Sequence, residues 1–325
     1  MQAETLYQYF NFLIASDLPL PELTEAGGDK AGYSFTLQAP GDLVGRDWSH
    51  HWRYADGNTF LSVACEGDSF VLRFPETADF RVVPDTGAIS CCPVPGITDN
   101  TVRHLLLDQV LPRVVGHDGR IVLHASAIAD AGQAILFMGD PWSGKSTLAA
   151  SYITQGGSLL ADDCVLLEYE GSNFFATPNY SGSRLWQDSL DALKDRTKIA
   201  REVSLYPMKK RLIYQGDGQK KQQGNLPVKA IFLLGPPGPM TGNRDITIRR
   251  LPGARIIPEL LKYTFVMDVK DKEKMKDKFH THGKIALSVP LYQLDYPRDY
   301  SILGKVFNAV RDVSSGNRAA TCSIQ

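Results

Sequence analysis

One short segment near the middle of the chain has the residue types and spacing needed to hold a phosphate. It fits the pattern Gly-x-x-x-x-Gly-Lys-Ser/Thr in full and reads Gly139-Asp140-Pro141-Trp142-Ser143-Gly144-Lys145-Ser146. The two glycines allow a tight turn that directs consecutive N–H groups inward, toward an anion at the start of a helix. Lys145 can then reach the β- and γ-phosphates of a nucleotide, and the Ser146 hydroxyl is placed to bind Mg²⁺.

The residues on either side of this segment support its interpretation as a P-loop, or Walker A motif. The apolar run Ala134–Met138 leads into the first glycine and is typical of a buried strand. A helix is predicted after Lys145, with an apolar stripe formed by Leu148, Ala149, Tyr152 and Ile153. The alternative is a glycine-rich turn between strand and helix that carries an incidental lysine.

Two adjacent acids, Asp162 and Asp163, interrupt the apolar sequence Leu-Leu-Ala-Asp-Asp-Cys-Val-Leu-Leu. Burying carboxylates inside a strand is costly unless a cation or hydrogen-bond donors compensate. A Mg²⁺ ion held by Ser146 would be such a cation, so one acid could bind the metal while the other acts as a base. The alternative is a turn in which one aspartate caps the backbone.

A third candidate is His124, within the apolar run Val-Leu-His-Ala-Ser-Ala-Ile. A single histidine in such a run is more often a hydrogen-bonded core residue than a functional one. However, the two strands predicted over residues 120–130 and 133–138 form a hairpin that leads into the P-loop. This arrangement is compatible with His124 lying close to the phosphate site.

Taken together, these residues resemble the catalytic domain of bacterial HPr kinase/phosphorylase. The resemblance rests on His124, the P-loop that begins at Gly139, and the segment Gly157-x-Leu-Leu-Ala-Asp162-Asp163, at the spacings seen in that family. It covers about residues 121–168. It implies an α/β fold with an HPr-kinase-type P-loop nucleotide-binding core, which is distantly similar to the nucleotide domain of phosphoenolpyruvate carboxykinase.

The resemblance also implies the roles of individual residues in an ATP- and Mg²⁺-dependent serine kinase. Ser146 and Asp162 would hold Mg²⁺, Asp163 would take the proton from the attacking serine hydroxyl, and His124 would support the acid pair or the phosphate. The residues that would bind the ATP phosphates are Gly139, Asp140, Pro141, Trp142, Ser143, Gly144, Lys145, Ser146 and Thr147.

Two departures separate the chain from the regulatory enzyme of that family. Thr147 stands where the family typically has glutamate, and the family's downstream signature for its protein substrate and reverse reaction is missing. The resemblance therefore implies neither sugar-uptake regulation through HPr nor phosphorylase activity.

The layout of the whole chain is closer to a divergent subgroup, the kinases encoded beside peptide-tailoring operons. The similar segments are residues 16–23 (Ser-Asp-Leu-Pro-Leu-Pro-Glu-Leu), the Leu-His-Ala-Ser-Ala run and residues 183–186 (Ser-Arg-Leu-Trp). Some of these kinases phosphorylate the C-terminal serine of a lasso-peptide precursor. Candidate cations for such a substrate are Arg184, Lys209, Lys210 and Arg211. The alternative for the last three is a solvated, exposed loop over residues 201–225.

The remaining sequence predicts a two-domain chain with a short tail. Residues 1–97 contain short β-rich runs separated by turn residues, typical of a small antiparallel sheet or sandwich that serves as an accessory domain. A helix is predicted from Thr98, and residues 98–312 would form the catalytic domain. Residues 313–325 are rich in small and polar residues and are predicted to be disordered.

Composition excludes several classes of function. The chain of 325 residues is 43% hydrophobic and 22% charged with a net charge of −1, so it lacks the cationic surface of a general nucleic-acid binder. It has neither an apolar run long enough to cross a membrane nor the features of a secretory signal. Five cysteines without a Cys-x-x-Cys pair are typical of reduced thiols in the cytoplasm.

Two other functions remain compatible with this sequence. One is an ATP-binding regulatory or scaffold protein with little catalysis. The other is a kinase of a small molecule, such as free serine or another metabolite, rather than of a peptide or protein. Members of the resembled family often form homo-oligomers, but the sequence leaves the oligomeric state of this chain open, as it does the choice between ATP and GTP.

Overall fold

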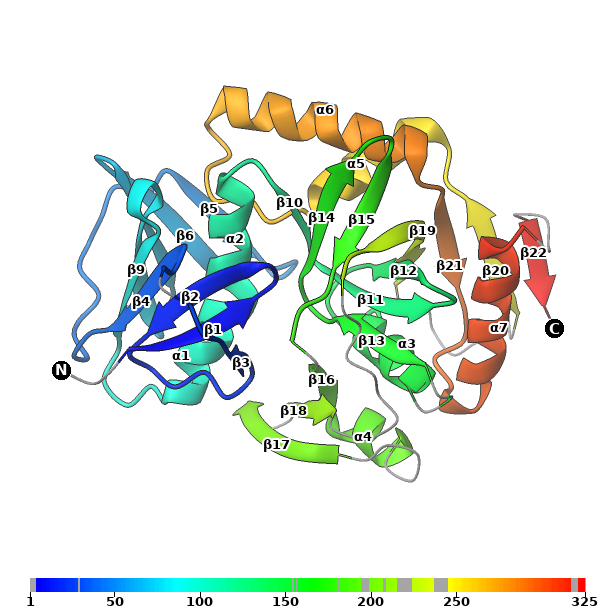
Figure 1. Cartoon of the computed structure of the whole chain (residues 1–325), viewed down its shortest axis with the longest axis horizontal. Coiled ribbons are helices and arrows are strands. Elements are labelled where there is room, and N and C mark those ends of the chain that lie inside the picture. Colours follow the sequence, from blue (N-terminus) through cyan, green and yellow to red (C-terminus); the bar gives the residue numbers. More distant parts are fainter. Residues whose placement is uncertain are drawn as a thin grey trace. The chain divides into compact units, whose positions relative to one another are not determined.

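The computed structural model describes residues 4–28, 30–153, 155, 157–180, 182–193, 199–206, 209–214, 224–236, 245–316 and 321–324. Only the backbone is described for residues 183, 184, 186, 199–206, 209–214 and 321–324. The chain divides into two compact units, Met1–Arg120 with Phe265–Asp277, and Ile121–Thr264 with Lys278–Gln325 (Figure 1).

The first unit contains a nine-stranded sheet with the strand order β3-β1-β2-β4-β9-β8-β7-β6-β5. Its strands are β1 (Thr5–Tyr9), β2 (Phe12–Ser16), β3 (Thr24–Glu25), β4 (Tyr33–Leu37), β5 (His50–Arg53), β6 (Thr59–Glu66), β7 (Ser69–Phe74), β8 (Ala78–Val83) and β9 (Ala88–Pro93). A short 3₁₀ turn, η1 (Pro84–Thr86), joins the last two strands. The β-rich character agrees with the sequence, but the sheet is mixed rather than antiparallel, because β4 pairs in parallel with both β2 and β9.

A long helical segment also belongs to this unit. It consists of α1 (Asp99–Leu105), a π-helical turn η2 (Leu106–Val110) and α2 (Leu111–His117). The predicted start is confirmed, since the Thr98 side chain accepts a hydrogen bond from the backbone N–H of Thr101. Pro112 lacks an N–H group, and the regular hydrogen-bond pattern is interrupted in the turn just before it. The Tyr9 hydroxyl donates to the carbonyl of Leu107, so the helix joins the first unit, and the division differs from the boundary expected at residues 97 and 98.

The run at residues 16–23, which contributed to the resemblance, has a structural role in the first unit. The Asp17 carboxylate accepts from the backbone N–H of Leu37, and Leu18, Leu20 and Leu23 are buried. Glu22 pairs with Arg103 of α1 at 3.2 Å. This run therefore fastens a loop to the sheet and the helix.

The second unit contains a ten-stranded sheet built on three parallel central strands. These are β12 (Gln133–Met138), β19 (Leu226–Leu234) and β21 (Leu291–Asp295). The surrounding strands are β10 (Ile121–Leu123), β11 (Ala125–Asp130), β13 (Ser158–Ala161), β14 (Val165–Glu170), β15 (Asn173–Thr177), β20 (Ile246–Arg250) and β22 (Thr321–Ile324). The predicted hairpin over residues 120–138 is confirmed as β11–β12, and β14 and β15 form a second hairpin.

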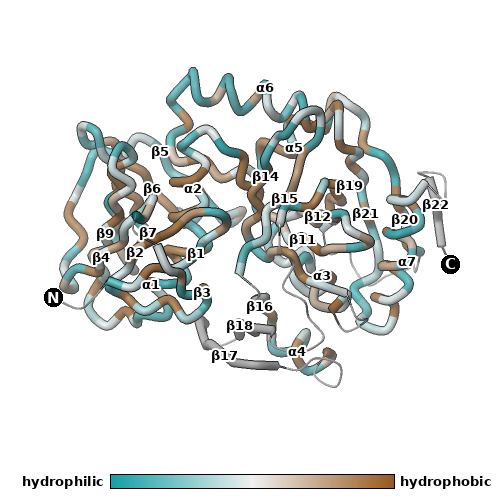
Figure 2. Tube along the Cα trace, in the orientation of Figure 1, coloured by the Kyte–Doolittle hydropathy of each residue, from teal (hydrophilic) through white to brown (hydrophobic). Residues whose placement is uncertain are grey.

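Helices cover both faces of this sheet, because its central strands are apolar on both sides. On β12, Ile135 and Phe137 pack with α3 (Lys145–Ile153), α4 (Gln187–Leu193) and α7 (Leu303–Ser314). The alternate residues Leu136 and Met138 pack with α5 (Gly253–Lys262) and α6 (Lys272–Ser288). Figure 2 shows that α6 is largely hydrophilic along its length, as expected for a helix that buries only a narrow stripe.

Two segments differ from the sequence-based expectation. Residues expected to form an exposed loop instead include β17 (Ile199–Tyr206) and β18 (Lys209–Tyr214), which form a three-stranded sheet with β16 (Gly182–Trp186). Residues expected to form a disordered tail include the end of α7 and β22, which pairs antiparallel with β20. An open strand edge offers backbone hydrogen bonds to any adjacent segment, and local composition does not reveal this. Residues 194–198, 207, 208, 215–223, 317–320 and 325 lie outside the described residues.

Within the part of the chain described here, no helix is both long and apolar enough to cross a membrane.

Candidate active site

The candidate residues meet at one edge of the sheet in the second unit. The carboxyl ends of the parallel strands β12, β19 and β21 lead into the segments at Gly139, Gly235 and Tyr296. Strand β13 runs in the same direction as β12, because both are antiparallel to β11, so Asp162 follows its carboxyl end. This edge is where open α/β sheets bind their ligands.

The P-loop adopts a tight turn that requires glycine at both ends. Gly139 has φ 153° and Gly144 has φ 90°, in the region that favours glycine. A Cβ atom on Gly139 would lie 2.6 Å from Oγ of Ser143 and 3.0 Å from the carbonyl oxygen of Leu234. Helix α3 then begins at Lys145, as predicted. Trp142 at the tip of the loop has φ 73° and is 69% exposed.

Two polar side chains of the loop are buried within it. The Lys145 ammonium donates to the carbonyl oxygens of Gly139 at 2.7 Å and Asp140 at 3.3 Å. Ser143 is fully buried, and among the described residues its hydroxyl has no hydrogen-bond partner. A buried polar group without a partner is rare in folded proteins and calls for an explanation. A bound anion would give this hydroxyl an acceptor.

Asp162 lies beside the first turn of α3. This is the position expected of an acid that binds a metal together with Ser146. Its side chain is buried, and Oδ1 accepts from Ser146 Oγ at 3.0 Å and from Ser126 Oγ of β11. The structure therefore brings together the two residues predicted to hold Mg²⁺. Sequence analysis missed Ser126, although its position only two residues after His124 was a usable signal.

The acid pair lies between strands rather than inside one, which corrects the prediction. Asp162 and Asp163 occupy the short connection from β13 to β14, because the backbone N–H of Cys164 donates back to the carbonyl of Asp162. Asp163, which lies between Asp162 and Cys164 in the chain, is half-buried and has φ 64°. Backbone strain of this kind is concentrated at functional sites.

His124 lies in the break between β10 and β11, at the same sheet edge and two residues before Ser126. It is half-buried, and its backbone N–H donates to the carbonyl of Tyr263 at 2.7 Å. The hydroxyl of Tyr263 in turn donates to Asp140 in the P-loop at 2.9 Å. The chain segment of His124 is thus connected to the loop through one residue.

Asp140 fastens the P-loop to the end of α5. The ammonium of Lys262 lies 2.6 Å from Asp140 Oδ1, which also accepts from Tyr263. Partial burial works against ionisation, but the hydrogen bonds from Lys262 and Tyr263 outweigh it and lower the pKa of Asp140 below its ordinary 3.8. Asp140 is therefore ionised and already paired with Lys262 and Tyr263 at the end of α5.

Sequence analysis missed a cation beside the loop, Arg298, which lies in the connection after β21. Its Nη2 donates to the carbonyl of Gly235 at 2.7 Å, and its guanidinium stacks 4.3 Å from the centre of the Tyr296 ring. A Cβ atom on Gly144 would lie 3.7 Å from Nη1 of Arg298. Among the described residues, Nε and Nη1 are buried without a hydrogen-bond partner. In the sequence this arginine is part of an ordinary turn, Tyr-Pro-Arg-Asp, and only the strand topology brings it to the loop.

The donor set suits magnesium better than a metal that needs many protein ligands. Within the described residues, no group of three or more His, Cys, Asp or Glu side chains gathers as a metal site. Mg²⁺ is commonly held by one or two carboxylates together with substrate phosphates and water. Ser146 and Asp162 fit this pattern.

The proposed substrate cations are placed only by their backbone. Arg184 of β16 pairs in register with Arg211 of β18, and Lys210 and Lys209 follow opposite Leu185 and Trp186. Their side chains lie outside the described residues. The three-stranded sheet is connected to the P-loop helix through α4, since Ser189 Oγ lies 3.1 Å from Thr147 Oγ1.

Comparisons with known proteins identify distant structural neighbours only. A scan of protein-family models and a search of curated proteins found no match. Among solved structures, the HPr(Ser) kinase/phosphatase of Coxiella burnetii is similar at 13% identity and a TM-score of 0.33, over 60% of this chain and 93% of that chain. This neighbour is of the kind that residues 121–168 resemble. At such a TM-score the similarity supports no inference about activity, which has to come from the site itself.

Proposed function

We propose that this protein is a Mg²⁺- and ATP-dependent kinase that phosphorylates a serine hydroxyl of a peptide or protein. The observation that carries the proposal is the hydrogen bond from Ser146 to Asp162 at 3.0 Å, at the start of the helix that follows the P-loop. A hydroxyl and a carboxylate placed together behind such a loop form the ligand pair of a phosphate-bound metal. The buried Lys145 and the half-buried Arg298 add positive charge around the same loop.

The phosphates would be bound by the loop's N–H groups, Lys145 and Arg298. Both cations now donate to backbone carbonyls, which are weaker acceptors than phosphate oxygens. Mg²⁺, held by Ser146 and Asp162, would neutralise charge on the β- and γ-phosphates. The Ser143 hydroxyl would gain an acceptor when the anion binds.

Asp163 would act as the base. As the serine oxygen forms its bond to the γ-phosphorus, the bond from that phosphorus to the bridging oxygen of ADP breaks, and the serine proton passes to Asp163. His124 would support the acid pair. Most of the catalysis would come from positioning and charge neutralisation.

The proposed acceptor is the C-terminal serine of a lasso-type precursor peptide, as the sequence resemblance implies. The experiment is mass spectrometry of such a peptide after incubation with the protein and Mg–ATP. A gain of one phosphate on the terminal serine is expected, and it should be absent with the Asp163→Asn and Lys145→Ala proteins.

The same experiment separates the two competing functions. An unmodified peptide together with phosphorylation of free serine or another metabolite would indicate a small-molecule kinase. ATP binding without transfer to any acceptor, unaffected by Asp163→Asn, would indicate a regulatory protein. Either result would contradict a peptide kinase.

A further inference from the structure

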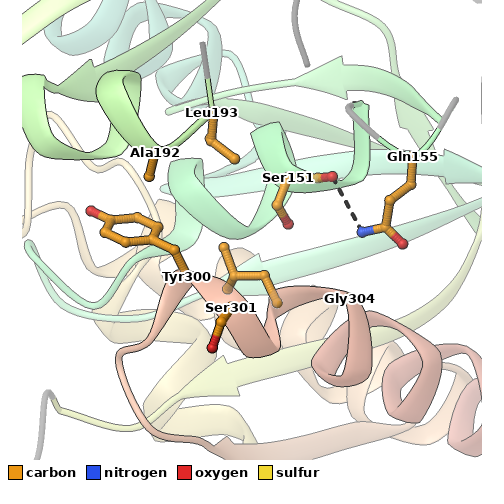
Figure 3. A pocket seen from close by; sticks show the side chains of 8 residues that line it. Ser151, Gln155, Ala192, Leu193, Tyr300, Ser301 and Gly304 are labelled. Carbon is orange, nitrogen blue, oxygen red and sulfur yellow. Dashed lines mark hydrogen bonds between the residues drawn. The ribbon is translucent and has the colours of Figure 1, made fainter. Parts of the chain in front are cut away.

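A cavity of about 400 Å³ lies beside the P-loop helix and is not used by the site described above. It is lined by Ser151, Gln155, Ala192, Leu193, Tyr300, Ser301, Leu303 and Gly304. Figure 3 shows the Tyr300 ring and the side chains of Ser151 and Ser301 around it. Its size falls in the range of small-molecule sites.

The cavity continues the P-loop along one face of α3. Thr147, in the first turn, and Ser151 are four residues apart and share a helix face, which also leads to Gln155. One helical turn rises about 5.4 Å, so the cavity begins directly beyond Thr147. A hydrogen-bonded chain connects the two, from Thr147 Oγ1 to Ser189 Oγ at 3.1 Å and on to the Tyr300 hydroxyl at 3.0 Å.

The order of groups along a bound nucleotide matches this direction. A P-loop holds the β- and γ-phosphates at its lysine and the α-phosphate toward the helix. The nucleoside must then extend past the α-phosphate, away from the reacting end. An acceptor hydroxyl, in contrast, has to approach the γ-phosphate near Asp163, and neither Asp162 nor Asp163 lines the cavity.

The walls have the chemistry that a nucleoside requires. Tyr300 is 39% exposed and offers an aromatic surface on which a base could stack. Partial burial raises the pKa of Tyr300 above its ordinary 10, so the phenol is neutral at physiological pH. Ser151, Ser301 and Gln155 supply hydroxyl and amide groups that can bind ribose or the edge of a base.

We propose that this cavity binds the nucleoside part of the nucleoside triphosphate whose phosphates occupy the P-loop. The inference rests on the proposed nucleotide-dependent function and supplies the nucleoside-binding residues that the sequence did not reveal. The segment from Tyr296 to Ser301 then serves both ends of the nucleotide. Arg298 contacts the phosphates beside Gly144, and Tyr300 contacts the nucleoside.

The test compares ATP with inorganic tripolyphosphate, which has the phosphates but no nucleoside. Each is titrated with Mg²⁺ into the full chain by isothermal calorimetry. Gly304 has open space around its Cβ position, so Gly304→Phe fills the cavity without a backbone clash. We expect Gly304→Phe to weaken ATP binding at least tenfold and to leave tripolyphosphate binding unchanged. Tyr300→Leu should act in the same direction with a smaller effect.

The matched control is Gly253→Phe, at the exposed start of α5, where a Cβ atom also meets open space. It should change neither affinity, and thermal unfolding should show that all three variants fold. The inference is overturned if Gly304→Phe leaves ATP binding intact, if it weakens both ligands equally, or if the wild-type protein binds ATP no more tightly than tripolyphosphate. A Gly304→Phe protein with unchanged KM for ATP but raised KM for the peptide would make the cavity an acceptor site.

This outcome is separable from failure of the proposed function. If ATP binding depends on the cavity but no peptide is phosphorylated, the result supports the nucleoside site and contradicts the proposed peptide kinase. If the peptide is phosphorylated normally by the Gly304→Phe protein at limiting ATP, the kinase assignment stands and the nucleoside site falls.

Discussion

Arg73 in the first unit and Arg298 in the second are both stacked on an aromatic ring. They differ in the groups that accept hydrogen bonds from their guanidinium groups. Arg73 lies 4.8 Å from the centre of the Trp48 ring and donates to both oxygens of Asp79, at 2.7 and 2.6 Å. Arg298 stacks on Tyr296 but donates to one backbone carbonyl, and it makes no ion pair with any residue that the structure describes. The first arginine completes a structural contact, and the second leaves its charge available for an anion.

Buried histidines show a similar difference between the units. His104 of α1 lies 2.8 Å from the carboxylate of Asp108, one turn away on the helix. His282 of α6 is also buried, but its partners are the carbonyl of Lys278 and the hydroxyl of Thr264. In this comparison, the buried histidine of the first unit contacts a carboxylate, whereas the buried histidine of the second unit contacts a backbone carbonyl and a hydroxyl.

The largest expected effect comes from removing the proposed base. Asp163→Asn should lower kcat about 10²–10⁴-fold, because general base catalysis contributes a factor of this size. Asparagine also tolerates the positive φ of this position, so the free energy of unfolding and the affinity for Mg–ATP should stay close to wild type. Steady-state kinetics and calorimetry measure these quantities. Normal turnover would show that Asp163 is not the base.

His282 should make the second unit sensitive to acid. Burial lowers the pKa of His282 from 6.5 to about 4, so the folded protein keeps this ring neutral while the unfolded chain binds a proton. Stability should therefore fall as the pH drops from about 6.5 toward 4, by a total of the order of 3 kcal/mol, with no contribution from this group above that range.

The measurement is urea unfolding across this pH range for wild type and His282→Gln, with His104→Gln as the control in the first unit. Removing His282 should flatten the pH dependence of the free energy of unfolding between about pH 4 and 6.5. Removing His104 should leave the part of this dependence that is due to His282 unchanged. Identical slopes for wild type and His282→Gln would contradict the assignment.

Substitution of the two arginines should affect different quantities, namely nucleotide affinity for Arg298 and folding stability for Arg73. Arg298→Lys removes the orphaned Nε and Nη1 donors and should weaken both ATP and tripolyphosphate about tenfold or more, since hydrogen bonds to charged groups contribute about 1.5–3 kcal/mol. Arg73→Lys loses the paired contact with Asp79 and should lower stability by about 1–2 kcal/mol without changing nucleotide affinity. Loss of stability but not of affinity in Arg298→Lys would show that its role is structural.

The sequence predicted the local parts of the candidate site and missed those that depend on topology. The strand, glycines, lysine and helix of the P-loop are contiguous, so their spacing alone determines their arrangement. The Ser146–Asp162 contact also follows from spacing, because a single helix separates β12 from β13. Arg298 could not be predicted, since it reaches the loop only because β21 runs parallel to β19 and ends at the same edge.

The same distinction explains the errors in the fold. The helix from Thr98 was predicted correctly, but its assignment to a domain depends on a contact with Tyr9, far away in the sequence. The strand β22 depends on the free edge of β20, which short-range composition does not report. Asp162 and Asp163 were expected inside a strand because their neighbours are apolar on both sides. The turn that they form is visible only in the backbone conformation of the folded chain, at the positive φ of Asp163.

The smallest expected effect concerns Asp140, whose pairing resembles that of the carboxylates in the first unit. Because the pKa of Asp140 is lowered below 3.8, the pairing stabilises the fold above that pH and is lost as the pH falls through the folded value. Lys262 and Asp140 are 52% and 54% exposed, so water and salt screen their attraction, and the contribution should be well under that of a buried pair. Asp140→Asn should therefore lower the urea midpoint slightly at pH 7, less at high salt, and progressively less as the pH falls below 3.8. A loss of stability that does not change as the pH falls would mean that Asp140 supports the loop through its hydrogen bond with Tyr263 and not through its charge.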